Sequence, residues 1–168
     1  MNKKPHNLQP HAKMLLSSLR SMGYTDETAI ADIIDNSISS GASEIQIYFD
    51  WEKRRIIIAD NGNGMSSEEL LKAMEIGSAD PAVMRASEDL GRFGMGMKTA
   101  SFSIGKSLYV ITRKNANISN AEWDLDYVAD NDEWEVLIHP TESINEEIES
   151  VSELVDFKSW DQGTIIIL

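Results

Sequence analysis

The segment from Glu27 to Ser40 constrains the fold more than any other stretch, because as a helix it can bury only one of its faces. At about 100° per residue, its apolar side chains share one side: Ile30, Ile33, Ile34 and Ile38. The opposite side carries side-chain oxygens: Asp32, Asp35, Asn36 and Ser39. The segment therefore predicts an amphipathic helix, whose oxygen-bearing face suits either solvent or a ligand.

Composition limits the classes of protein that remain. With 168 residues, 42% of them hydrophobic and 26% charged, the chain can form one globular domain with a substantial core. It has no apolar run near the roughly 18 residues of a membrane span and no secretory signal, so we expect a cytoplasmic protein without a membrane partner. The absence of cysteine and the three scattered histidines argue against a zinc centre, so we expect any metal to be an oxygen-bound ion.

The formal net charge of -13 is unevenly distributed. Four basic residues and no acidic residue precede Asp26. The acidic remainder repels phosphate backbones, so direct nucleic-acid binding by this domain is disfavoured. We expect residues 1–25 to form an arm with a short helix, and residues 26–168 to form the domain of a longer protein, although a natural chain end fits the sequence as well.

Hydrophobic periodicity predicts an alternation of helices and strands. The predicted helices are 12–22, 27–40, 66–74 and 95–104. The predicted strands are 44–50, 55–59, 106–113, 122–127, 134–139 and 163–168. The acidic stretch 142–156 has no clear prediction, and residues 77–92 contain few large apolar side chains, which indicates a mobile lid.

The first glycine-rich loop follows the predicted strand 55–59. Asp60 ends an apolar strand, so its carboxylate must find a hydrogen-bond donor, which could be the exocyclic amine of a base. Gly62 and Gly64 would let a flat base lie against the backbone. A tight turn in which Asp60 caps the backbone explains the same residues.

The second glycine-rich loop, Gly91 to Lys98, precedes the predicted helix 95–104. Met97 stands where a Walker loop needs lysine, and Thr99 stands where a dinucleotide loop needs its third glycine, so neither motif is satisfied. The loop still suits an anion, because glycines admit close approach, free amides begin the helix and Lys98 adds positive charge. A turn that only tightens packing is the alternative.

Four segments in order resemble the GHKL superfamily, which includes gyrase B, MutL, the ninety-kilodalton heat-shock chaperones, MORC proteins and histidine kinases. They are Asp32 to Asn36, Asp60 to Met65, Gly91 to Lys98, and Gly163 with Thr164. The first and third are most similar to the MORC and heat-shock chaperone branch. The resemblance implies a Bergerat-type α/β (α+β) two-layer sandwich, with a mixed, mostly antiparallel sheet and an ATP pocket between the sheet and helices on one face.

The resemblance also implies roles for single residues. Asn36 would coordinate Mg²⁺, while Asp60 would receive the adenine amine with help from Thr164 through water. The base pocket would be lined by Gly62, Gly64 and Met65, and the phosphates would be held along Gly91, Gly94, Met95, Gly96, Met97 and Lys98. The usual catalytic glutamate, four residues before the asparagine, is Asp32 here, and an acidic residue often found three after it is Ser39.

The leading functional hypothesis is a Mg²⁺-dependent ATPase module whose nucleotide state drives homodimerisation or a conformational cycle in a longer protein. One alternative is a nucleotide-gated binding module with little turnover. Another is the catalytic domain of a histidine kinase, although no phospho-acceptor helix precedes the domain in this sequence.

Overall fold

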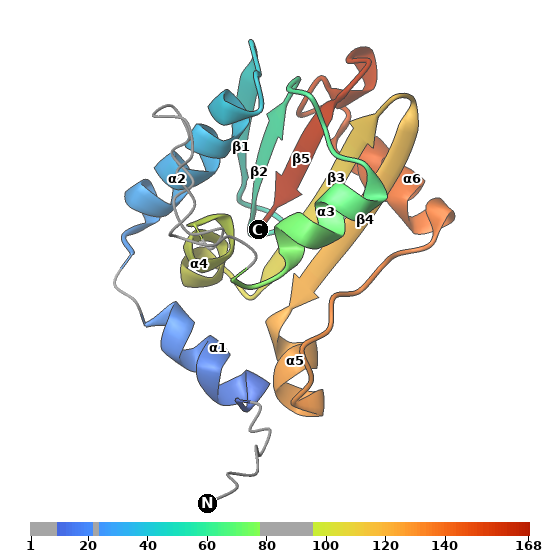
Figure 1. Ribbon diagram of the computed structural model, residues 1–168. Helices are drawn as coiled ribbons and strands as arrows, with labels where there is room; N and C mark the ends of the chain where they lie inside the picture. The colour runs from blue at the N-terminus through green and yellow to red at the C-terminus, as the bar shows by residue number, and fades with distance from the viewer. Residues whose placement is uncertain (1–9, 22–23, 78–95) are drawn as a thin grey trace, which may run out of the picture.

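A computed structural model describes residues 10–21, 24–77 and 96–168 of the chain. A five-stranded sheet lies between two sets of helices (Figure 1). The helices are α1 (Ala12–Arg20), α2 (Asp26–Ser39), α3 (Ser67–Met74), α4 (Gly96–Ile104), α5 (Leu125–Asn131) and α6 (Thr141–Val151). The strands are β1 (Ile45–Asp50), β2 (Arg55–Asp60), β3 (Ser107–Lys114), β4 (Asn117–Asp124) and β5 (Gly163–Ile167). No helix in these ranges is both long and apolar enough to cross a membrane.

The last strand of the chain lies in the middle of the sheet. The strand order is β1-β2-β5-β3-β4, and every described pairing is antiparallel. All five residues of β5 are buried, which confirms the strand predicted at 163–168. The α/β fold is confirmed, and its described sheet is antiparallel throughout rather than mixed.

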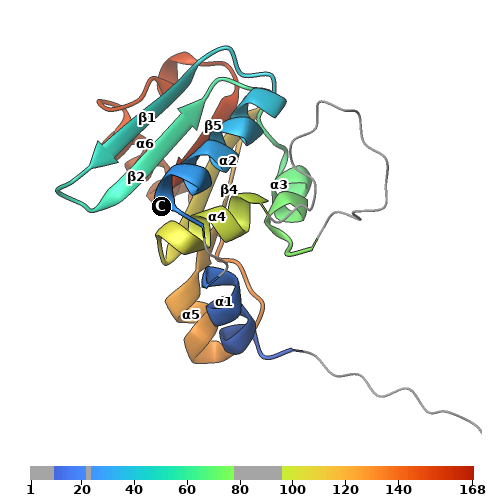
Figure 2. The same ribbon diagram turned by 90° about the vertical axis from the view of Figure 1, so that its left-hand side faces the viewer.

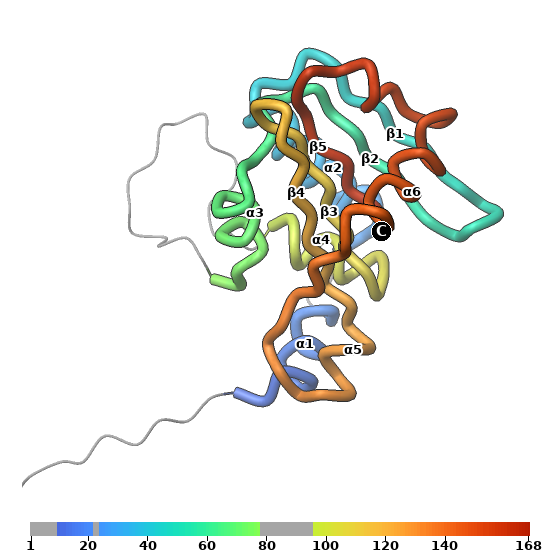
Figure 3. The backbone as a smooth tube through the Cα atoms, turned by 90° about the vertical axis from the view of Figure 1, so that its right-hand side faces the viewer, coloured from blue at the N-terminus to red at the C-terminus, as the bar shows by residue number. Residues whose placement is uncertain are grey.

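Alternation along the strands divides the core into two clusters. Ile58, Val110 and Ile166 face the side on which helices α1 to α5 contribute to the core (Figure 2). Ile57, Ile111 and Ile165 face the other side, where α6 packs (Figure 3). Helices therefore cover both faces, and the prediction of two layers with helices on one face was wrong. The acidic stretch 142–156 had no clear prediction, but its first part belongs to α6, which buries an apolar stripe: Ile144, Ile148 and Val151.

Local signals explain where two of the predicted helices begin. The Thr25 hydroxyl accepts a hydrogen bond from the Thr28 amide (3.3 Å) at the start of α2. At α3 the Ser66 hydroxyl accepts from the Glu69 amide, and the Glu69 carboxylate accepts from the Ser66 amide, so the predicted capping box is confirmed. The four predicted helices agree with α1 to α4 to within two residues at each described end.

Two strand predictions were wrong. The strand predicted at 122–127 begins earlier, as β4, and ends at Asp124, whose carboxylate accepts from the Asp126 and Tyr127 amides and starts α5. The strand predicted at 134–139 is absent from the described structure, where only Leu137 forms an isolated bridge with Glu122. A helix cap therefore prevailed over strand propensity in the first case.

The predicted core face of α2 needs one correction. Ile33 is fully buried, but Ile38 is 55% exposed, and the residue buried one turn after Ile33 is Ser37. Ser37 faces the sheet because its hydroxyl bonds with a buried carboxylate there. A polar contact, rather than apolar periodicity, therefore sets the rotation of this end of α2.

We predict that the centre of the sheet determines stability. Ile165→Ala removes a fully buried side chain from β5 and should lower the free energy of unfolding by about 2–5 kcal/mol. Ile47→Ala on the edge strand β1, where the side chain is 39% exposed, is the matched control and should cost less than about 1 kcal/mol. Urea denaturation measures both, and equal losses would contradict the central role of β5.

Candidate functional site

The end of β2 and the middle of α2 meet at a buried carboxylate. Asp60 is 4% exposed, and its Oδ2 accepts a hydrogen bond from the Ser37 hydroxyl (2.8 Å). Its Oδ1 accepts from the Gly62 amide (2.9 Å). Burial raises the pKa of Asp60 above its usual value, while hydrogen bonds from Ser37 and from the Gly62 and Thr164 backbones oppose that rise. The carboxylate predicted to read a base thus has donors on both oxygens.

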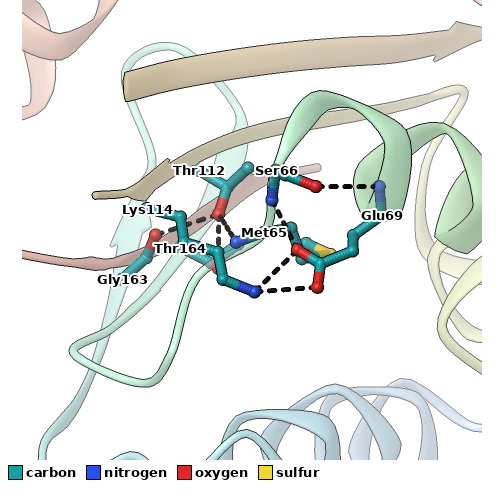
Figure 4. Close-up of polar contacts among 7 residues, drawn as sticks. All are labelled: Met65, Ser66, Glu69, Thr112, Lys114, Gly163 and Thr164. Atoms are coloured by element: carbon teal, nitrogen blue, oxygen red, sulfur yellow. Dashed lines mark hydrogen bonds and ion pairs between the residues drawn. The ribbon is translucent and has the colours of Figure 1, made fainter. Parts of the chain in front are cut away.

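Asp60 belongs to a polar row that crosses three strands. Its register partner on β5 is Thr164, whose partner on β3 is Thr112. The Thr112 hydroxyl lies 3.2 Å from that of Thr164 and donates to the Gly163 carbonyl (3.1 Å). It also accepts from the Met65 amide (2.8 Å), as Figure 4 shows. Thr112 therefore ties the loop after β2 to the sheet beside Asp60.

The glycines of the first loop are required by packing. A Cβ on Gly62 would lie 2.0 Å from the Ser40 hydroxyl oxygen. Gly64 has a φ of +59°, and its Cβ would lie 2.0 Å from the Arg113 carbonyl oxygen. The space that these missing side chains leave is occupied by the protein itself, so the predicted contact of both glycines with a base stays a prediction.

Asp32 and Asn36 lie one turn apart on α2, beside the start of α4. The Asn36 side-chain amide donates to the Asp32 carbonyl (2.8 Å). The Asp32 carboxylate oxygen Oδ2 accepts from the Tyr24 hydroxyl (2.8 Å) and lies 4.0 Å from where a Gly96 Cβ would be. The structure therefore brings the predicted base to the first residue of α4, with the predicted metal ligand one helical turn away on α2.

The Lys98 ammonium points to the end of α3 and not to the start of α4. Its buried ammonium donates to the carbonyls of Ala73 (2.7 Å) and Glu75 (2.8 Å), at the end of α3. Desolvation lowers the pKa of Lys98 to about 8, and the charge of Glu75 opposes the shift. In this structure the ammonium holds α3 and α4 together, and the predicted phosphate contact of the Lys98 backbone stays a prediction.

The structure describes some of the other residues predicted to contact the nucleotide, and the rest lie outside the described ranges. Met65 and Met97 are partly buried against the larger core cluster. Gly91, Gly94 and Met95 lie outside the described residues, as does all of the predicted lid except Gly77.

Three residues in polar contact with the site were missed by the sequence analysis: Tyr24, Ser37 and Thr112. Thr112 has an ordinary sequence environment, and its pairing with β5 brings it to the site. For Ser37 the sequence offered one signal, its position one turn after Ile33 on the buried side of α2.

The donor set near α2 suits Mg²⁺ better than a tightly chelated metal. No cluster of three or more His, Cys, Asp or Glu side chains with metal-binding geometry occurs among residues 10–21, 24–77 and 96–168. Asn36 can offer one ligand atom, its amide oxygen. Its amide nitrogen donates to the Asp32 backbone carbonyl. Magnesium commonly keeps several waters and takes phosphate oxygens, so one protein ligand fits this ion.

A hollow of about 480 Å³ opens elsewhere, between the start of α3 and the β3–β4 turn. An ion pair between Lys114 and Glu69 (2.7 Å) lines it, and hydrogen bonds to Lys114 and Ser66 lower the pKa of Glu69 to about 2. Its lining does not include Asp32, Asn36 or Asp60. Ser119 lines the hollow and is the register partner of Thr112 on β4, so the hollow lies next to the polar row. It does not contain the predicted site.

We predict that the lowered pKa of Lys98 makes the stability of the fold depend on pH. Between pH about 8 and about 10.5 the unfolded chain binds more protons at Lys98 than the folded chain does, so raising the pH should stabilise the fold. Relative to Lys98→Met, the parent chain should gain up to about 3 kcal/mol of unfolding free energy across this window. Urea denaturation at several pH values measures the difference, and parallel profiles would contradict it.

The sequence is similar to those of a known family of ATPases. A sequence model of the family described as "Histidine kinase-, DNA gyrase B-, and HSP90-like ATPase" matches residues 24–159. The chain is 31% identical over 113 residues to "ATPase morc-1" of Caenorhabditis elegans, covering 64% of this chain and 13% of that protein. It is 30% identical over 96 residues to "MORC family CW-type zinc finger protein 3" of Mus musculus, covering 55% and 10%.

A third relative matches a smaller share of this chain. The "DNA mismatch repair protein MutL" of Trichlorobacter lovleyi is 32% identical over 75 residues, which is 40% of this chain and 13% of that protein. The chain thus spans only a small fraction of the relatives that it matches. Since the family match covers most of the chain, including Asp32, Asn36 and Asp60, the protein belongs to the GHKL family of histidine kinase-, DNA gyrase B- and HSP90-like ATPases, with MORC ATPases among its relatives.

Proposed function

We propose that this domain binds ATP together with Mg²⁺ and hydrolyses it. The proposal is supported by the position of α2, whose Ser37 donates to the Asp60 carboxylate and whose Asp32 lies beside α4, one turn before Asn36. An ATPase site must recognise adenine and activate water. In this proposal α2 contributes residues to both tasks.

Adenine recognition falls to Asp60. Each carboxylate oxygen can accept more than one hydrogen bond, so Oδ2 can hold the Ser37 hydroxyl and an exocyclic amine together. Guanine would present a carbonyl there, and two acceptors would then face each other without a donor. Thr164, directly opposite on β5, is the natural second contact through water.

The phosphate side would be served by α2 and by the start of α4. Asn36 would hold Mg²⁺ through its amide oxygen, and the bound ion would supply positive charge to the phosphates. Asp32 would accept a proton from the attacking water. Because aspartate is one methylene shorter than glutamate, its oxygen must be held close to that water, within about 2.6–3.2 Å in the reacting complex.

The longer relatives support a role for this domain within a larger protein. Their matched segments are a small part of their lengths, so a nucleotide-driven dimerisation or conformational cycle would involve other domains. The shorter Asp32 favours a second candidate function, in which the domain holds ATP and signals its presence with little turnover. The two candidates differ in what Asp32 does.

Base recognition is tested at Asp60. Asp60→Asn should weaken ATP binding by about 10-fold or more and reduce the preference for ATP over GTP, because the amide cannot offer two acceptor oxygens. Calorimetry with both nucleotides measures this. Asp126→Asn removes an exposed carboxylate paired with Lys106 and is the control that should leave binding unchanged. Equal binding of ATP and GTP by the parent chain would refute the assignment.

Hydrolysis is tested at Asp32. Asp32→Asn should lower turnover by about 10²- to 10⁴-fold with nearly unchanged ATP affinity, whereas Asp32→Glu should retain or raise it. Asn36→Ala should instead weaken Mg²⁺-dependent binding. Asp26→Asn, at the exposed start of the same helix, is the control. If Asp32→Asn turns over ATP as fast as the parent, the base lies elsewhere; if the parent binds ATP without turnover, the binding module is the correct function.

A further inference from the structure

Tyr24 joins the segment before α2 to the proposed catalytic base. It lies between α1 and α2 in the chain, and its hydroxyl donates to Asp32 Oδ2 at 2.8 Å. Its ring is partly buried against the larger core cluster. Because the ring is anchored by packing, the hydroxyl has a fixed position from which it can orient the carboxylate.

The environment of this hydroxyl keeps it a donor. Burial, followed by the bond to Asp32, raises the pKa of Tyr24, while a hydrogen bond from the Thr99 side chain lowers it. A phenol with a raised pKa stays protonated at neutral pH and can donate throughout the reaction. Donation to a carboxylate stabilises the ionised form, which is the form that can accept a proton from water.

The contact also fixes a carboxylate oxygen close to α4. Tyr24 engages Oδ2, the oxygen that lies 4.0 Å from a Cβ placed on Gly96. The hydroxyl therefore restrains the carboxylate at the start of α4. A short side chain gains most from such a restraint, because aspartate cannot reach a misplaced water as glutamate can.

We propose that Tyr24 is the positioning residue for Asp32, fixing its carboxylate in the orientation that accepts the proton of the attacking water. The proposal rests on the proposed function, since it gives the base of that reaction its orientation. It also means that Tyr24, a residue before α2, influences turnover without touching the nucleotide.

The test is Tyr24→Phe, which removes the hydroxyl and keeps the ring. Single-turnover hydrolysis by the full chain should slow by about 10-fold with little change in ATP affinity. The control is Tyr127→Phe, which also removes a tyrosine hydroxyl bonded to a carboxylate, that of Glu135 (3.1 Å). It should leave both the rate and the ATP affinity unchanged.

A double variant separates positioning from a general structural effect. In the Asp32→Asn background, Tyr24→Phe should cause no further loss, because the base on which it acts is gone. Unchanged hydrolysis by Tyr24→Phe, or the same loss in both backgrounds, would overturn the inference while leaving the proposed function intact.

An inactive parent chain would instead overturn the proposed function and the catalytic part of this inference. The contact itself then has a separate readout at Tyr24, whose pKa is raised by burial and by the bond to Asp32. Asp32→Asn should lower the pKa of Tyr24 in a ¹³C titration of the tyrosine rings, because the charge that opposes phenolate formation is gone. An unchanged pKa of Tyr24 would show that Tyr24 does not hold Asp32 in solution.

Discussion

The hydrogen bonds of the buried Asp60 carboxylate determine how the rest of the site is arranged. A carboxylate in the interior is costly unless donors surround it, and here the donors come from separate parts of the chain. Ser37 contributes from α2, Gly62 from the following loop and Thr164 from β5. Satisfying one charge therefore fixes α2 against the sheet, and with it the neighbouring positions of Asn36 and Asp32.

Close packing of the loop after β2 against its neighbours explains why it needs glycines. Thr112 draws the loop toward β3 through the Met65 amide, and Gly64 then passes so close to Arg113 that a Cβ has no room. Gly62 passes equally close to Ser40. In the sequence, a base pocket and a tight turn were alternative explanations of these glycines. The structure shows the tight turn, in which the Asp60 carboxylate accepts from the Gly62 amide. Contact of this loop with a base remains a proposal.

The sequence predicted those features that depend on local periodicity or on a strong motif. The hairpin β1–β2, helices α1 to α4 and the buried strand β5 have such signals, and the pairing of Asp60 with Thr164 agrees with the shared site implied by the resemblance. The strand predicted at 122–127 was wrong because Asp124 caps a helix, a choice that propensity does not reveal. Tyr24 and Thr112 were missed because each acts across a tertiary contact.

Contacts around α3 extend this arrangement to the start of α4. The carbonyls of Ala73 and Glu75 are bound by Lys98, and that of Met74 by the Trp123 indole (3.0 Å). Since the carbonyls at a helix end need partners, these bonds set where α4 begins relative to α3 and β4. Gly96 is thereby placed beside Asp32 by contacts in which no nucleotide takes part. In the proposed reaction the base and the metal ligand are thus preorganised by the fold, and binding energy need not be used to assemble them.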